Sequence, residues 1–484
     1  MTFSVTQASS IQENTSRQQA EHKMEKMKEH YWSFALQAKA YPPGSFRTMP
    51  LWLWQLGVIT LMTYGALRIL WPTVGSPAET ITALLGLFSV LFYGSKLRSS
   101  APIWLLGAAL LVQLLSWTLG YFHHPEWIAD NPKLDRLGKL FIFIAVAWWL
   151  AGSTRRTLLL WSLALIGFLI ATFVLGNGLE EWQAGLSGQR VGFGIRNAQH
   201  GAMLFGVTLL GLAIFAHRCL SPGPWRVLRT VIWSLLITIA LVGMLIGQTR
   251  AVWLALMLTL PVTLTLWLYH SRAGIQPAPD RKRKWLGLCL TIIVIVGLLI
   301  FFYQPLVERI TTEKEVVNQL LEGDMESIPY TSIGIRINTW IATLEWIQER
   351  PLVGWGEEAR NLVIDHTPWL PPFVKERFGH LHNFLLEIWV AYGLLGVGVI
   401  ATLAIWIGLR TWQAWRAGIM PGDMALFAMS FFVYWMVVNQ FEAYNAFWTG
   451  VFVHNLVVGG LVTHIWHWQY VASPLSDVPP LQGK

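Results

Sequence analysis

Charged residues are scarce in this chain. They make up 13% of its 484 residues, about half the share of an ordinary soluble domain, whereas 54% of the residues are hydrophobic. Apolar runs of about 20 residues, long enough to cross a bilayer, recur along the sequence. These runs are continuous and do not alternate with a period of two, which excludes a β-barrel. The composition therefore predicts an all-α polytopic membrane protein.

Other features are also missing. The chain has two cysteines, Cys219 and Cys289, which is too few for a disulfide framework. Neither the Walker nor the Rossmann glycine pattern is present. The net charge of +8 lies mostly in short loops between apolar runs, where membrane topology explains it, so we expect no nucleic-acid partner.

Twelve apolar segments are long enough to span the membrane. Their boundaries, read from the sequence, carry an uncertainty of a few residues. We predict spans at about 51–70, 80–95, 102–121, 138–153, 157–175, 199–217, 230–248, 251–270, 286–304, 382–409, 424–440 and 448–468.

Lysine and arginine set the orientation of these spans. With the N-terminus in the cytoplasm, the basic residues fall on cytoplasmic segments, whereas the opposite loops at 71–79 and 441–447 contain neither lysine nor arginine. We therefore expect both termini to be cytoplasmic. The predicted order is a cytoplasmic basic N-terminal segment (1–50), spans one to nine (51–304), an extracytoplasmic loop domain (305–381), spans ten to twelve (382–468) and a cytoplasmic tail (469–484).

The loop domain is expected to fold as a helical cap. Its stretch "IGIRINTWIATLEWIQERPLVGWG" has apolar residues at helical spacing, and Pro351 followed by Gly354 and Gly356 ends the helix. The apolar face predicted for this helix consists of Ile337, Trp340, Ile341, Leu344 and Ile347.

Several basic or titratable residues fall on the extracytoplasmic side, against the usual bias: Arg190, Arg196, Arg250, His380 and His382. Arginine beside hydrocarbon is costly, and its planar fork suits phosphate, so arginines from separate helices are candidates to bind a diphosphate. The alternative is interfacial snorkelling.

The arginines have a second structural alternative, which is ion pairing with Glu180, Glu181 or Glu442. The two histidines have alternatives of their own. A His-x-His pair can bind zinc, but no third and fourth ligand stands at a recognisable spacing. A histidine can instead deprotonate a hydroxyl nucleophile, and Glu387, one helical turn further on, is placed to orient it.

Four stretches together resemble the superfamily of O-antigen ligases and Wzy-type polymerases. The resemblance extends over about residues 50–470, and its last two stretches surround the large loop in the family's order. The four are "RVGFGIRNAQ" from Arg190, Thr-Arg-Ala at 249–251, "RINTWIATLEWIQERPLVGWG" from Arg336 and "HLHNFLLEIWVAYGLLG" from His380.

The resemblance implies a site. Arg190 and Arg250 are expected to bind the diphosphate, and His382 to be the catalytic histidine, with His380 the alternative. Arg196, Arg336 and Glu387 are expected to support substrate binding. No metal and no cofactor is implied, and the first outer loop, whose one acid is Glu79, offers no acidic metal-ligand set.

The resemblance also implies a reaction. An O-antigen ligase transfers a glycan from undecaprenyl diphosphate to a sugar hydroxyl of lipid A–core, with inversion, at the periplasmic face of the bacterial inner membrane. The expected partners are therefore the lipid-linked donor, the lipid A–core acceptor and membrane lipids. Alternatives within the superfamily are a Wzy-type polymerase and a protein-glycosylating branch.

Two alternatives come from other classes: a solute or bicarbonate transport component and an envelope-assembly scaffold. Transport predicts polar residues through the bilayer centre, whereas the main polar intrusions here, Asn439, Gln440, His454 and Asn455, are expected to form interhelical hydrogen bonds.

Overall fold

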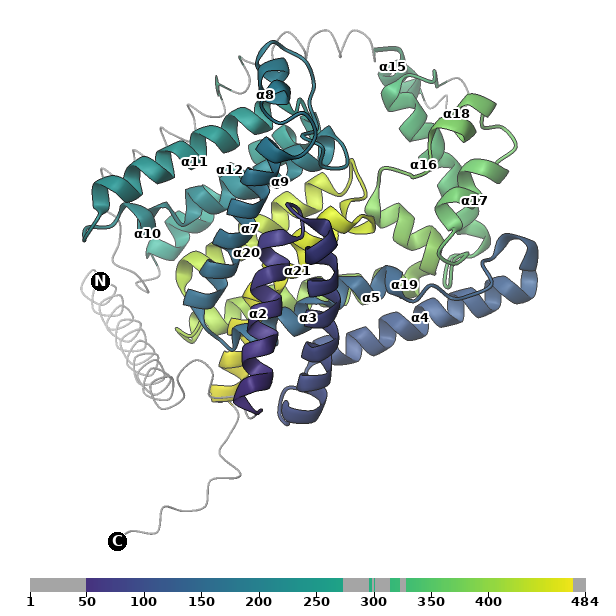
Figure 1. The fold of residues 1–484 in the computed structure, drawn as a ribbon. Helices are drawn as coiled ribbons and strands as arrows, with labels where there is room; N and C mark the ends of the chain where they lie inside the picture. Colours follow the sequence, from purple (N-terminus) through teal and green to yellow (C-terminus); the bar gives the residue numbers. More distant parts are fainter. Residues whose placement is uncertain (1–48, 273–295, 298–299, 301–313, 323–327, 473–484) are drawn as a thin grey trace, which may run out of the picture.

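The computed structural model describes residues 49–272, 296–297, 300, 314–322 and 328–472, and in these ranges it is helical, with no strand (Figure 1). The long apolar helices are α2 (Leu51–Leu67), α3 (Pro72–Tyr93), α4 (Ala101–His123), α7 (Thr154–Val174), α9 (Ala198–Ile214), α11 (Arg226–Ile246), α12 (Arg250–Arg272), α19 (Phe384–Arg416), α20 (Gly422–Val438) and α21 (Trp448–Ala472). Shorter elements are η1 (Pro125–Trp127), α5 (Asp135–Gly138), η2 (Lys139–Phe141), α6 (Phe143–Leu150), α8 (Leu179–Leu186), α10 (Ala216–Leu220) and η3 (Tyr444–Ala446).

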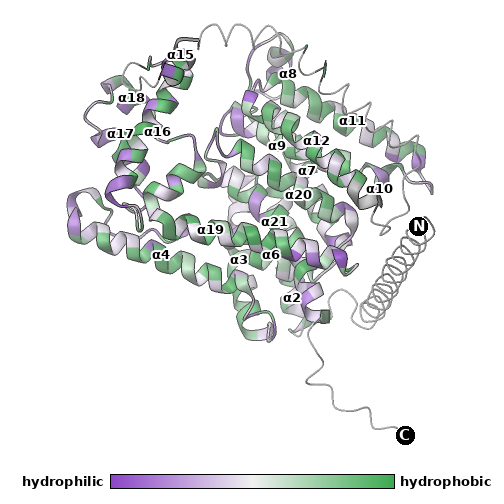
Figure 2. Cartoon of the chain, turned by 180° about the vertical axis from the view of Figure 1, so that it is seen from behind, coloured by the Kyte–Doolittle hydropathy of each residue, from purple (hydrophilic) through white to green (hydrophobic). Residues whose placement is uncertain are grey.

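The fold confirms a polytopic membrane protein. Seven of the described helices are long and apolar enough to cross a bilayer, and three shorter apolar helices accompany them. Large apolar side chains also cover the outside of the bundle: Trp52, Trp104 and Phe122 are 65%, 71% and 78% exposed. Such exposure is expected where lipid replaces water. Figure 2 shows this apolar covering along the long helices, with hydrophilic residues gathered at helix ends and in the loops.

Helix α21 forms the centre of the bundle. It packs against α6, α7 and α19 and is buried along most of its length. Close packing depends on glycine, since a Cβ at Gly459 would lie 2.5 Å from the side chain of Val146. The predicted interhelical hydrogen bonds are present here: Asn455 accepts from the Phe143 N–H at 2.8 Å, and His454 contacts the Leu140 carbonyl at 3.0 Å.

Eleven of the twelve predicted spans coincide with helical segments, and the twelfth, 286–304, lies almost wholly outside the described residues. The predicted loop at 71–79 is wrong, because α3 begins at Pro72. Proline is favourable in the first helical turn, where its missing N–H costs nothing. Glu79 therefore lies within α3, where it pairs with Arg68 at 2.7 Å.

The cap is formed by α15 (Lys314–Glu322), α16 (Ser332–Glu349), α17 (Ala359–His366) and α18 (Pro372–Arg377), and it lies to one side of the bundle in Figure 1. The α16 helix ends before Pro351, as predicted, but its predicted apolar face is mostly not buried. Of its five residues only Ile347 is buried, and Leu344 is 45% exposed. The buried face instead contains small polar residues that satisfy themselves locally, as when Thr343 donates to the Thr339 carbonyl at 2.6 Å.

Helix α19 is broken at Gly393, where φ is +62° and ψ is −165°. The cap segment at 351–356 fills the break: the N–H groups of Leu394 and Leu395 donate to the carbonyls of Pro351 and Leu352. A Cβ at Gly393 would lie 2.1 Å from the Leu352 carbonyl carbon, so this close approach requires glycine. Before the break, the N–H groups of Trp355 and Gly356 donate to the carbonyls of Val390 and Ala391, so the cap is tied to α19 on both sides of Gly393.

Candidate active site

The two histidines of the His-x-His pair converge on one acid. His380 Nε2 and His382 Nδ1 each lie 3.0 Å from a different oxygen of Glu442. Glu442 is 2% exposed, whereas His380 and His382 are 23% and 14% exposed. Glu442 comes from the loop between α20 and α21, 60 residues further along the chain. The sequence named Glu442 as a partner for arginine, and its pairing with the histidines was missed.

Local structure fixes the histidine loop. Asn383 caps α19 by accepting from the Leu386 N–H at 3.1 Å, and His382 immediately before it has φ +54°. Between the histidines, the Leu381 carbonyl accepts from Trp340 Nε1 at 2.7 Å, and the Leu381 N–H donates to Glu387 at 3.1 Å. A left-handed conformation is unfavourable for histidine, so these contacts are what hold it in place. Glu387 thereby orients the loop through its backbone.

The electrostatics of this cluster favour a neutral base beside an ionised acid. Burial lowers the pKa of His382 below its ordinary value, and the Glu442 carboxylate opposes that effect. Burial alone would raise the pKa of Glu442, but the hydrogen bonds with His380 and His382 lower it well below its usual range. His382 is therefore neutral near pH 7, with Nδ1–H donated to Glu442 and Nε2 left to accept a proton.

The predicted diphosphate arginines lie where two loops meet. Arg190 Nε donates to the Gly247 carbonyl at 3.4 Å, and Gln248 donates to the Gly188 carbonyl at 2.9 Å. This brings the α8–α9 loop against the turn at which Arg250 begins α12. Arg336 on α16 belongs to the same group. Burial lowers the pKa of Arg336, the Glu442 carboxylate raises it, and the positive charge of Arg190 lowers it further. The guanidinium groups of Arg190 and Arg336 therefore lie near one another, with Arg336 also acting on Glu442, and Arg250 begins α12 beside the Arg190 loop.

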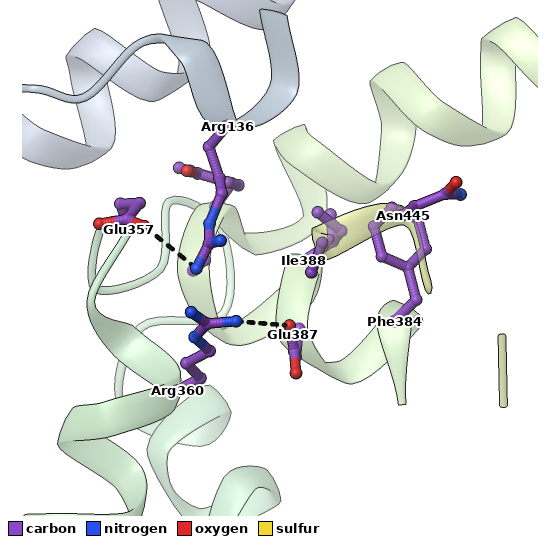
Figure 3. Close-up of a pocket in the computed structure, with 10 residues that line it drawn as sticks. Arg136, Glu357, Arg360, Phe384, Glu387, Ile388 and Asn445 are labelled. Atoms are coloured by element: carbon purple, nitrogen blue, oxygen red, sulfur yellow. Dashed lines mark ion pairs between the residues drawn. The ribbon is translucent and has the colours of Figure 1, made fainter. Parts of the chain in front are cut away.

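Two further arginines lie on the His380 side. The Arg196 guanidinium carbon is 3.6 Å from the centre of the Phe447 ring, and that of Arg360 is 5.8 Å from the same centre. The His380 ring meets Phe447 edge-on at 5.4 Å. Figure 3 shows Arg360 paired with Glu387, at 3.8 Å. Sequence reasoning missed Arg360, which gave no signal because it sits within an ordinary polar helix of the cap.

The same cluster is the one group in the described part of the chain with the donor set of a metal site. The ligating atoms of His380, His382 and Glu442 lie within 4.8 Å of one another, and two imidazoles with a carboxylate suit zinc. The positive charge around the cluster opposes the binding of a cation. The charge of Arg336 lowers the pKa of His382, and the guanidinium groups of Arg196 and Arg360 lie near the neighbouring Phe447 ring. The surroundings suit an anion better than a metal.

Two other histidines near the cap pack on aromatic side chains. His124 stacks on Trp127 at 4.6 Å, and His366 contacts the same ring at 4.9 Å. Trp355 is 3% exposed and packs on Trp346. These contacts join the cap to the segment that follows α4.

The fold and this cluster define a helical membrane protein with a polar site under a cap. Residues 233–401 match the family model described as O-antigen ligase. This part of the chain is thus similar to the O-antigen ligase family, which confirms the resemblance seen in the sequence. The matched region contains Arg250, Arg336, His380, His382 and Glu387. Arg190, Arg196 and Glu442 lie outside it. The comparison with curated proteins gives no match.

Proposed function

We propose that the protein is an O-antigen ligase, which transfers a glycan from undecaprenyl diphosphate to a sugar hydroxyl of lipid A–core. The reaction takes place at the periplasmic face of the bacterial inner membrane, with both termini in the cytoplasm. The observation that carries the proposal is the pairing of His380 and His382 with one buried carboxylate, Glu442, among arginines from separate segments.

In this proposal His382 is the general base. Its Nδ1–H is held by Glu442, so Nε2 accepts the proton of the attacking hydroxyl as the new glycosidic bond forms. The carboxylate stabilises the imidazolium that results, because an ionised acid within hydrogen-bond distance favours the charged form. His380, on the other oxygen of Glu442, is the alternative base.

Arg190 and Arg250 stabilise the leaving diphosphate. The bond from the anomeric carbon to the diphosphate oxygen breaks, and its electron pair stays on the oxygen. Fixed guanidinium groups in a partly buried site stabilise that charge without a metal ion. Attack from the face opposite the leaving group inverts the anomeric centre. Arg336 supports the same group.

The family match holds equally for a Wzy-type polymerase, which uses a second lipid-linked glycan as acceptor. A lipopolysaccharide gel separates the two functions, using cells that lack their own ligase and carry either the wild type or His382→Ala at matched expression. Polymer attached to lipid A–core with the wild type alone supports the ligase and the base. A change in polymer length without attachment supports the polymerase. Attachment by the variant as well rules out His382 as the base.

A transport component is the remaining alternative. It predicts polar residues along a path through the membrane, whereas Asn455 and His454 are used in hydrogen bonds between α21 and the α5–α6 segment. In the proposed enzyme the titratable groups gather at one end of the bundle, below the cap.

A further inference from the structure

Arg196 and Arg360 form a second pair of neighbouring positive charges. They come from the α8–α9 loop and from α17, and their guanidinium groups approach the same Phe447 ring. Burial lowers the pKa of Arg196, Glu442 opposes this, and the charge of Arg360 lowers it again. Two like charges held this close are costly unless an anion lies between or beside them.

The carboxylates nearby offset this pair only in part. Glu387, Glu357 and Glu358 oppose the lowering of the Arg360 pKa, but among the described residues none of them is within hydrogen-bond distance of its guanidinium group. Among the described residues no carboxylate lies within 4.0 Å of Arg196. Arg360 meets Glu387 at 3.8 Å, too long for a hydrogen bond, and its Nε and Nη1 atoms are buried without a hydrogen-bond partner in that part of the chain. Glu442 is already held by both histidines. The pair therefore has unused capacity to donate hydrogen bonds to an anion.

The pair is separate from the arginines assigned to the diphosphate. The charge of Arg190 lowers the pKa of Arg336, and that of Arg336 lowers the pKa of His382, whereas Arg196 and Arg360 share Phe447 with His380. The two groups thus have different neighbours in the histidine pair.

The side from which a ligand reaches Arg360 is also constrained. The pocket drawn in Figure 3, which Arg360 and Glu387 line, has a volume of about 20 Å³, which is enough for one water molecule. A phosphate or carboxylate group is larger than that, so this pocket does not admit it; toward Phe447, by contrast, Arg196 is exposed.

We propose that Arg196 and Arg360, with Phe447 between them and His380, form a second anion subsite. It binds a phosphate or carboxylate group carried by a sugar of a glycan substrate, apart from the donor diphosphate. This inference rests on the proposed function for the identity of the ligand as a glycan. Arginine suits the task because its planar fork binds two oxygens of either group.

The direct test is binding by the purified full chain in detergent micelles, measured by titration calorimetry with methyl glucuronide and with glucose 6-phosphate. Methyl glucoside, which is neutral, is the control ligand. We expect both anionic probes to bind and Arg196→Gln to weaken them about tenfold or more, as loss of a charge-assisted hydrogen bond does. Arg196→Gln is preferred as the first variant because Arg196 is exposed, so we expect its replacement to leave the fold intact.

Matched controls define the outcomes. Arg155→Gln removes an exposed arginine at the far end of α7 and should bind the probes as the wild type does. Arg190→Gln should also keep glucuronide binding, since Arg190 belongs to the other group. The proposal is overturned if the wild type binds neither probe, or if Arg196→Gln binds them unchanged.

Two further measurements separate this inference from the proposed function and identify the source of the anion. If transfer fails in cells but Arg196→Gln still weakens probe binding, the ligase assignment falls and the subsite stands. In membranes that do transfer, dephosphorylated lipid A–core is compared with the phosphorylated form at constant donor. A KM difference that disappears in Arg196→Gln places the anion on the acceptor. A difference that persists, together with an Arg196→Gln defect in donor KM, places it on the donor glycan.

Discussion

Replacing Glu442 by glutamine is the most informative single change in the proposed enzyme. The amide has the same shape as the carboxylate, so packing is preserved at a position that is 2% exposed. It removes the charge and turns one of the two acceptor oxygens into a donor, so that only one of His380 and His382 can still be bonded as before.

The magnitude follows from the two 3.0 Å contacts. A hydrogen bond to a charged group contributes about 1.5–3 kcal/mol, and in this site it favours the imidazolium that forms as the base takes its proton. Losing one such contact in the transition state lowers kcat/KM by roughly 10- to 150-fold.

The pH dependence gives an independent test, because the structure predicts the direction in which the acid limb of the profile moves. Activity that requires neutral His382 rises as pH increases through the pKa of His382, which burial places below the ordinary histidine value. Since Glu442 opposes that lowering, its removal lowers the pKa further. Glu442→Gln should therefore be slower at every pH, with the acid limb of its kcat/KM profile moved to lower pH.

The assay is transfer of a labelled glycan from undecaprenyl diphosphate to lipid A–core in membranes, followed across pH on gels. Glu345→Gln, an acid-to-amide change at an exposed cap position, is the matched control. An unchanged rate with an unchanged acid limb would refute the role given to Glu442. A slower rate with an unchanged acid limb would mean that Glu442 has a structural role and does not act on the base.

Three other outcomes are expected. His382→Ala should abolish transfer while His380→Ala only reduces it, and equal losses measured in the same membrane assay would leave the base unassigned. Arg190→Gln should lower kcat/KM for the donor by roughly 10-fold or more, from loss of a charge-assisted contact, with the KM for the acceptor unchanged. Gly393→Ala should loosen the cap, because its Cβ meets the Leu352 backbone at 2.1 Å and its φ of +62° is strained for alanine, at a cost of about 1–3 kcal/mol. Limited proteolysis within 351–356 would report this, and a cleavage rate equal to that of the wild type would contradict it.

The spans were predictable from sequence because a bilayer imposes one requirement, a long apolar run, on each of them. The sequence was less informative about features on which that requirement has no bearing. Pro72 was taken as a loop residue because proline is common both in loops and in the first turn of a helix, and the sequence alone does not tell the two apart. The burial of the α16 apolar face was not predictable, because lipid and protein interior both accept apolar side chains and Leu344 carries no sign of which one it meets.

The candidate site was predictable in part. The motif around His380 and His382 has its own local pattern, and so does Arg250 in its turn. Glu442 lies 60 residues from His382 on another loop, and no spacing rule joins them. Arg360 is an ordinary residue of a polar helix until the fold brings it to Phe447. Contacts between distant segments depend on tertiary packing, which a single sequence does not display.

The break at Gly393 divides α19 into two pieces, and the cap segment at 351–356 is hydrogen-bonded to both of them. The N–H groups of Trp355 and Gly356 donate to the carbonyls of Val390 and Ala391 before the break, whereas Leu394 and Leu395 donate to the cap after it. At the start of α19 the Phe384 N–H donates to the Asn439 carbonyl, which joins the histidine loop to the segment that leads to Glu442. The cap, the histidine loop and the bundle are therefore held in one framework, which fixes the two histidines against Glu442 before a substrate binds.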